Sequence, residues 1–200
     1  MQSMKKQSQQ GATLIETSLW LIILGIVVAA AIVLFVVVSG KMQITKAQEE
    51  IITVVPAIIQ QFTPQSNFDG LTPDAVNSSG LFTQEQFNAG FFTSPFGSTS
   101  QIGFYAVPST NSTAGAMVIS FVPEAACLAL SAMSWPDSII GMDTVKTPAA
   151  PTAPSTVITD GDGNLLYGTG HATQSVANQT LGCTPTADGA VNLNIYFVKK

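Results

Sequence analysis

The chain has 200 residues, of which 46% are apolar but only 10% are charged, whereas an ordinary soluble domain carries about 25% charge. Seven lysines, no arginine and 12 acidic residues give a net charge of −5, which disfavours a phosphate-binding surface and hence nucleic-acid binding. One histidine and two cysteines are too few for a typical zinc site and disfavour a His-centred acid–base enzyme.

Residues 19–38 form an uninterrupted apolar run. As a helix this run is about 30 Å long, which matches the hydrocarbon core of a bilayer. Lys5 and Lys6 precede it, and a positive flank stays on the cytoplasmic side. The pattern therefore predicts a single-pass protein with an exported carboxyl-terminal domain.

Two other interpretations compete for this run. A cleaved secretory signal could use the small residues at 29–31, but its apolar region normally ends there, and here the run continues from Ile32. A plain membrane anchor fits the hydrophobicity but leaves Glu16 unexplained. Glu16 is the only ionisable side chain between Ala12 and Gly40, and a carboxylate at the edge of a span needs a partner.

Gly11 is followed by the small residue Ala12, by Glu16 four positions after Ala12, and by an unbroken apolar helix over residues 17–38. This pattern resembles the signature of the type IV prepilins, which is a Gly, a small or apolar residue, a Glu four positions further on, and an unbroken apolar helix. The first mature residue of the commonest pilins is Phe, so the small Ala12 points to the class called b.

The resemblance implies how the chain is processed and assembled. A prepilin peptidase would cut between Gly11 and Ala12 on the cytoplasmic side and methylate the new amine of Ala12. The mature chain would then run from Ala12 to Lys200. In a filament, the amine of one subunit would be neutralised by Glu16 of its neighbour, which sets the axial register of the buried helices.

The function expected from this resemblance is that of a structural subunit, without enzymatic activity or cofactor, that polymerises into a thin surface filament. Its partners would be copies of itself, the prepilin peptidase, the pilus assembly platform and the inner membrane before assembly, with no nucleic acid along the shaft. The filament would serve adhesion, aggregation or conjugative contact. A pseudopilin of a secretion system and a minor tip pilin are the alternatives; a membrane-anchored enzyme is a third, without a candidate site.

The expected domain plan has four parts: a leader peptide over residues 1–11, a transmembrane and filament-core helix over 12–40, an amphipathic helix over 41–62, and a globular domain over 63–200. In the third part apolar residues recur every three or four positions: Ile44, Ala47, Ile51, Val55, Ile58 and Phe62. Pro56 lies inside this part and should kink or break it.

The remainder predicts an α+β domain, in which the amino-terminal helix packs on an antiparallel β-sheet as in the pilin fold. Strands are expected over residues 101–107, 116–122 and 191–198, because apolar or β-branched residues cluster or alternate there between turn signals. Helices are expected over 83–87 and 123–133. The Pro-rich residues 147–154 predict an exposed loop.

Two further features concern individual side chains. Cys127 and Cys183 are an even pair in an exported domain, which favours a disulfide closing region 127–183 over buried free thiols. Asp160, Asp162 and Asn164 alternate as in the start of a calcium loop, but the downstream Glu is replaced by His171. Asp-Gly is also a turn signal, so a turn is preferred to a weak calcium site, and His171 is expected to be a surface residue.

Overall fold

The computed structural model describes residues 12–107, 112–146, 149–155, 165–168, 176–185 and 189–199. The chain divides into two compact units, Met1–Met42 and Gln43–Lys200. Its first element, α1 (Ala12–Gln61), supplies the described part of the first unit and enters the second.

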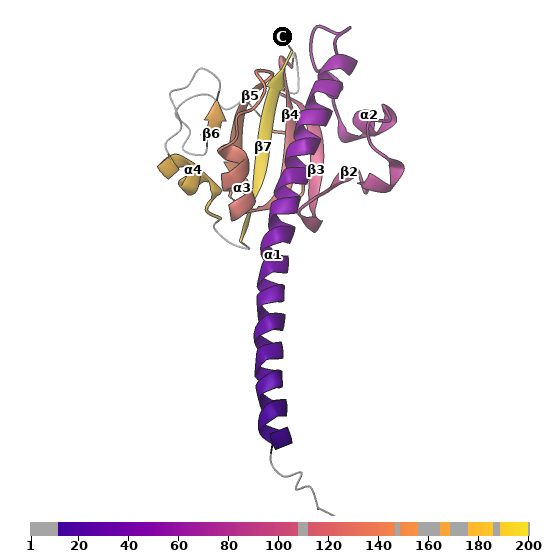
Figure 1. The fold of residues 1–200 in the computed structure, drawn as a ribbon. Helices are drawn as coiled ribbons and strands as arrows, with labels where there is room; N and C mark the ends of the chain where they lie inside the picture. Colours follow the sequence, from indigo (N-terminus) through magenta and orange to yellow (C-terminus); the bar gives the residue numbers. More distant parts are fainter. Residues whose placement is uncertain are drawn as a thin grey trace, which may run out of the picture. The chain divides into compact units, whose positions relative to one another are not determined.

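The second unit is built on an antiparallel sheet, which has seven strands among the described residues (Figure 1). The sheet order is β1-β2-β3-β4-β7-β5-β6, so the last strand lies between β4 and β5 near the centre. The strands are β1 (Phe87–Asn88), β2 (Phe91–Ser94), β3 (Gly97–Val107), β4 (Ala114–Pro123), β5 (Ile139–Val145), β6 (Leu165–Gly168) and β7 (Ala190–Val198). Besides α1, the described residues contain the helices α2 (Pro73–Ser78), α3 (Glu124–Ser131) and α4 (Val176–Cys183), and a 3₁₀ turn at Gln84–Gln86.

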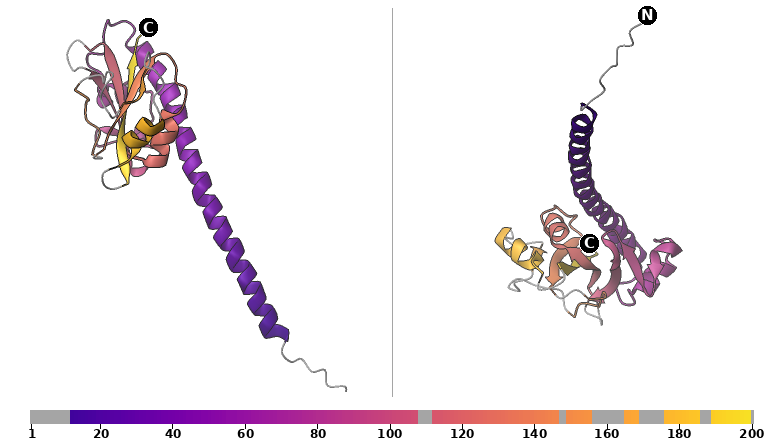
Figure 2. Two further views of the ribbon diagram at one scale, coloured as in Figure 1. Left: turned by 90° about the vertical axis from the view of Figure 1, so that its left-hand side faces the viewer. Right: turned by 90° about the horizontal axis from the view of Figure 1, so that it is seen from below.

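The second half of α1 packs on the sheet through the predicted apolar stripe (Figure 2). Ile51 and Ile58 are fully buried, Ile44 is partly buried, and the same core contains Val122 and Leu130. Burying each such side chain contributes about 1.5–3 kcal/mol. The amphipathic pattern is therefore confirmed, together with the long helix on an antiparallel sheet.

The helix continues through Pro56, so of the two predicted outcomes, a kink or a break, the break does not occur. A proline inside a helix costs about 3 kcal/mol or more. Val54, Val55 and Ile58 on either side of it are buried in the core, and their packing offsets that cost because tertiary contacts supply most helical stability in proteins.

Strand β7 carries the alternation expected of residues 191–198, but both of its faces are covered. Val191, Leu193, Ile195 and Phe197 are fully buried in the main core. The intervening Asn192, Asn194 and Tyr196 are also buried, at 5% exposure or less. The polar residues of β7 therefore face protein and not water.

The segment 149–155 is a largely exposed loop, as predicted, but it also helps to cover that second face. Asn192 donates a hydrogen bond from Nδ2 to the carbonyl of Ala149 (3.0 Å), and Tyr105 donates its hydroxyl to the carbonyl of Pro151 (2.7 Å). Pro151 is buried, although its neighbours in this segment are largely exposed. Polar residues of the sheet hold the loop by hydrogen bonds to its backbone, which no local sequence signal reveals.

The other predicted elements are present, some with altered type. Strands β3 and β4 contain residues 101–107 and 116–122, and α3 starts after Pro123, which is its N-cap. The short helix expected over 83–87 is instead a 3₁₀ turn followed directly by β1. Gln86 Oε1 accepts a hydrogen bond from the backbone N–H of Thr83 (3.0 Å), as a capping-box side chain does.

Candidate assembly surface

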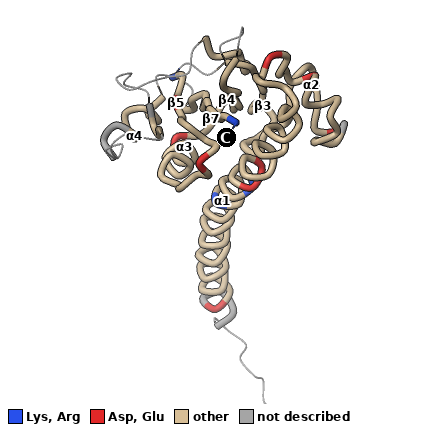
Figure 3. Tube along the Cα trace, turned by 90° about the horizontal axis from the view of Figure 1, so that it is seen from above, with Lys and Arg blue, Asp and Glu red and all other residues tan. Residues whose placement is uncertain are grey.

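The apolar part of α1 is exposed in the isolated chain. Its large apolar side chains between residues 19 and 38 are 43% to 74% exposed, and Figure 3 shows no charge along this stretch. The helix is long and apolar enough to cross a membrane. Water is a poor environment for so much apolar surface, so the segment requires lipid or other helices around it.

Glu16 lies at the start of this apolar surface. Ala12 is the first residue of α1. Glu16 lies one helical turn further on, about 6 Å along the helix axis, and its side chain is exposed. Gly11 and the rest of the predicted leader lie outside the described residues. The helix thus presents one carboxylate at its amino-terminal end and no other ionisable side chain before Lys41.

The carboxyl-terminal end of α1 is fixed by a residue from the far end of the chain. Lys199 Nζ donates to the carbonyls of Phe62 (2.6 Å), Gln65 (2.9 Å) and Asn67 (2.7 Å). The same ammonium lies 4.7 Å from the ring centroid of Phe68. Carbonyls at a helix end lack partners within the helix, and Lys199 supplies the donors that the chain reversal after α1 needs.

The loop after α1 is also tied to the sheet. Asp69 Oδ1 accepts hydrogen bonds from the backbone N–H (3.0 Å) and the hydroxyl of Ser112, just before β4. These bonds stabilise the ionised carboxylate and hold the pKa of Asp69 below its usual value. The hydrogen bonds from Ser112 have the largest effect, and the hydrogen bond from Asn67 adds a smaller one. Asp69 therefore attaches the loop after α1 to the residues that lead into β4.

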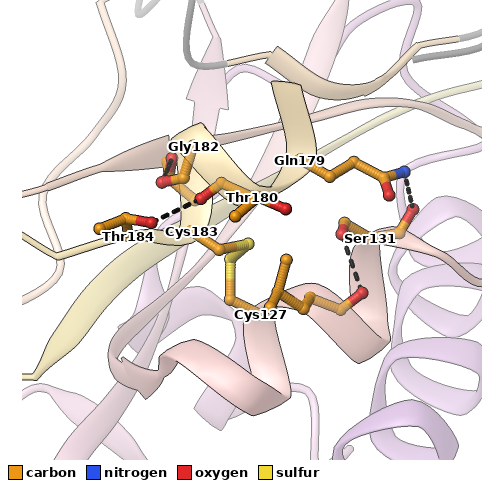
Figure 4. The surroundings of a disulfide bond; sticks show 9 residues. Cys127, Ser131, Gln179, Thr180, Gly182, Cys183 and Thr184 are labelled. Atoms are coloured by element: carbon orange, nitrogen blue, oxygen red, sulfur yellow. Dashed lines mark hydrogen bonds between the residues drawn. A yellow bond between two sulfur atoms is a disulfide. The ribbon is translucent and has the colours of Figure 1, made fainter. Parts of the chain in front are cut away.

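The predicted disulfide is present between Cys127 of α3 and Cys183 of α4, and both cysteines are fully buried (Figure 4). Two polar contacts flank it: Gln179 Nε2 donates to the carbonyl of Ser131 (3.3 Å), and Thr144 Oγ1 donates to the carbonyl of Gly182 (2.8 Å). A Cβ on Gly182 would lie 2.4 Å from Leu166 Cδ2, so glycine permits the close approach of α4 to β6. The bridge joins α3 in the core to the α4–β5–β6 side of the sheet.

A groove lies between α1 and the segment that precedes β1. Its volume is about 300 Å³, and we call it the Glu50 groove. It is lined by Lys46, Glu49, Glu50, Thr53, Val54, Leu81, Phe82 and Gln86. Glu50 Oε2 is buried in it without a hydrogen-bond partner. Burial raises the pKa of Glu50 to about 7, although Lys46 one turn away opposes the shift.

Replacing Glu50 with Gln is expected to change how stability depends on pH. Because the pKa is raised from 4.5 in the unfolded chain to about 7 in the folded one, the wild type loses stability as pH rises through that window. Glu50→Gln should be more stable than the wild type at pH 8 and about equal to it at pH 4. Urea unfolding of the full chain in detergent measures both, and Glu85→Gln on the exposed 3₁₀ turn is the control. Equal pH dependence in wild type and Glu50→Gln would contradict the assignment.

Among the residues that the structure describes, no group of three or more His, Cys, Asp and Glu side chains is placed to hold a metal. Asp160, Asp162, Asn164 and His171 lie outside these residues, so the choice between a turn and a weak calcium site stays a prediction.

A comparison with known protein structures identifies the fold of the chain. A solved structure that matches is that of TcpA, a type IV pilin from the Vibrio cholerae El Tor biotype. The match has a TM-score of 0.54 and covers 80% of this chain and 99% of TcpA.

The chain has the type IV pilin fold. The 18% sequence identity is low, so the likeness establishes the fold alone. No family model matches the sequence, and no curated protein matches it.

Within this pilin fold, the sequence alone points to the exposed helix, Glu16 and the disulfide, but it misses two features. Lys199 acts on carbonyls that lie between 132 and 137 residues away in the chain. Glu50 is one of the polar residues between the apolar positions of the α1 stripe, which predicts an exposed side chain. No signal near Glu50 in the sequence indicates that Leu81 and Phe82 line the same groove.

Proposed function

We propose that this protein is a type IV pilin, the structural subunit of a pilus, and that it polymerises through its amino-terminal helix into a thin surface filament. The observation that carries the proposal is the combination of the Gly11–Ala12–Glu16 motif with an exposed apolar helix that continues into a pilin-fold domain. In a filament these helices bury one another and the sheet domains face outward.

The proposed mechanism begins with processing. A prepilin peptidase cuts after Gly11 and methylates the amine of Ala12, while residues 12–40 hold the precursor in the inner membrane. The cationic amine and the Glu16 carboxylate would each be costly in apolar surroundings when alone. Pairing Ala12 of one subunit with Glu16 of its neighbour satisfies both groups and fixes how far each subunit is displaced along the filament.

The domain plan belongs to the same proposal. Residues 1–11 are the leader, 12–40 form the filament core, 41–62 continue as the helix that packs on the sheet, and 63–200 form the domain exposed on the pilus. A small first residue, Ala12, favours class b. The disulfide-closed region 127–183 contributes to the outer surface, which meets other cells or surfaces in adhesion, aggregation or conjugative contact.

Mass spectrometry of the mature protein tests the processing step. We expect a mature chain that starts at N-methylated Ala12. Gly11→Val should block the cut and leave the full-length precursor in the membrane, whereas Gly25→Ala, which has open space around its Cα, should be processed normally. An uncut wild-type chain starting at Met1 would overturn the prepilin interpretation.

A further inference from the structure

The apolar run of α1 has one ionisable side chain on each side of it. Glu16 precedes residues 19–38 and Lys41 follows them, with no charged residue in between (Figure 3), and both side chains are exposed. The two residues are 25 positions apart, which in a helix is about 38 Å along the axis. A bilayer has a hydrocarbon core about 30 Å thick and measures about 40–45 Å with its headgroup layers. Both charges therefore fit into the headgroup layers of one bilayer.

This spacing restricts the depth of the helix from both sides. The midpoint of residues 19–38 is also the midpoint between Glu16 and Lys41, so each charge is about 19 Å from the bilayer centre when the run is centred. The hydrocarbon ends at about 15 Å. A shift of more than about 4 Å in either direction would bring one charge into the hydrocarbon, where it is costly. A tilt of about 20° shortens the distance between the charges to about 36 Å and leaves both outside.

Trp20 lies at the cytoplasmic boundary that this depth defines. It is the second residue of the run, about 13 Å from the centre of the run, and its side chain is 64% exposed. Tryptophan is enriched at membrane interfaces, because its ring is apolar while its indole N–H needs a polar partner. Trp20 and the two charges therefore indicate the same depth.

We propose that before assembly the lipid bilayer surrounds residues 19–38, with Trp20 at the cytoplasmic boundary of the hydrocarbon and Glu16 outside it, in the headgroup layer. Glu16 then enters apolar surroundings only when the subunit leaves the membrane for the filament, where the amine of a neighbouring Ala12 pairs with it. This inference rests on the proposed function, because it assigns the position of the pilin precursor in the inner membrane.

Quenching of Trp20 by brominated lipids measures this depth. The full chain is reconstituted in phosphatidylglycerol vesicles with bromine near the headgroup, in the middle or at the end of the acyl chains. Trp20→Phe gives the signal to subtract, because the other tryptophan, Trp135, is buried in the second unit. We expect the strongest quenching of Trp20 from bromine nearest the headgroup. Strongest quenching from the chain end, or weak quenching by every lipid, would overturn the proposal.

A matched control places a tryptophan at the centre of the run. Val28→Trp, combined with Trp20→Phe, keeps the number of tryptophans and moves one of them by two helical turns. This tryptophan should be quenched most by bromine at the end of the acyl chains. The same quenching profile for positions 20 and 28 would contradict the assigned depth.

Thiol labelling locates Glu16 without removing it. The described chain has no free cysteine, so an introduced one is the only reactive thiol. Thr17→Cys is next to Glu16, and Leu24→Cys lies on the same helix face about 10 Å deeper. Thiolates form in water and react with a water-soluble maleimide, so in inverted inner-membrane vesicles Thr17→Cys should be labelled about tenfold or more faster than Leu24→Cys. Equal rates in the vesicles would overturn the proposal.

Both measurements are independent of polymerisation, because they use the full chain in membranes without the assembly genes. Surface filaments together with a deep Trp20 would overturn the assigned depth and leave the subunit role intact. A Trp20 at the boundary in a protein that never forms filaments would support the depth and overturn the filament role.

Discussion

Replacing Glu16 with Ala is expected to abolish filament formation while the protein still inserts into the membrane. Removing one partner of a buried ion pair leaves the other charge uncompensated, at a cost of about 3–5 kcal/mol. That corresponds to a loss of roughly 10² to 10⁴ in subunit affinity. Glu16→Gln keeps the shape and removes the charge, so it should fail in the same way. Sheared surface protein and the membrane fraction, both quantified by immunoblot, measure assembly and insertion.

A control for the Glu16 variants is Glu85→Ala, which removes an exposed carboxylate from the second unit. It should assemble like the wild type, and this would show that the loss depends on position and not on net charge. Filaments of normal number and length from Glu16→Ala would refute the pairing with the Ala12 amine, even if the protein remains a pilus subunit.

Removing the disulfide is expected to cost the domain about 4 kcal/mol, as the chain-entropy model gives for a loop of this length. The bridge joins cysteines 56 residues apart and restricts the unfolded chain between them. In Cys127→Ala/Cys183→Ala the urea midpoint of the full chain in detergent should fall by roughly 2 M. Trp135 reports the transition, because its ring is buried beside α3 and its Nε1 donates to the carbonyl of Leu130 (3.0 Å).

The matched control for this variant is the wild type under reducing conditions. Reductant should lower the wild-type midpoint toward that of the double alanine variant and leave the double variant unchanged. If the double variant unfolds at the same urea concentration as the oxidised wild type, the bridge does not stabilise the domain.

The sequence predicts the elements whose signals are local. The apolar run is recognised by its length and its lack of charge. The stripe from Ile44 to Phe62 and the alternation over residues 191–198 repeat with the period of a helix and of a strand. The Cys127–Cys183 pairing is also predictable, since two cysteines in a domain that the sequence predicts to be exported have one possible pairing. These features together indicate the fold class, a long helix on an antiparallel sheet.

What the sequence does not predict depends on contacts between distant segments. Both faces of β7 are buried because segment 149–155 binds Asn192 and Tyr105, and a period-2 pattern cannot tell a polar face covered by protein from one covered by water. Pro56 stays helical because core packing on both sides of it outweighs its local cost. Glu50 is buried by the segment that carries Leu81 and Phe82, well beyond the end of α1, so its raised pKa has no local signal.

Immunogold electron microscopy of cells that express this protein together with its assembly genes tests the central claim most directly. With antibody against the second unit, we predict thin surface filaments labelled at regular intervals along their whole length, and none in cells that lack the gene. Label confined to filament tips would make the protein a minor subunit. Unlabelled filaments, or label on the membrane without filaments, would contradict the account.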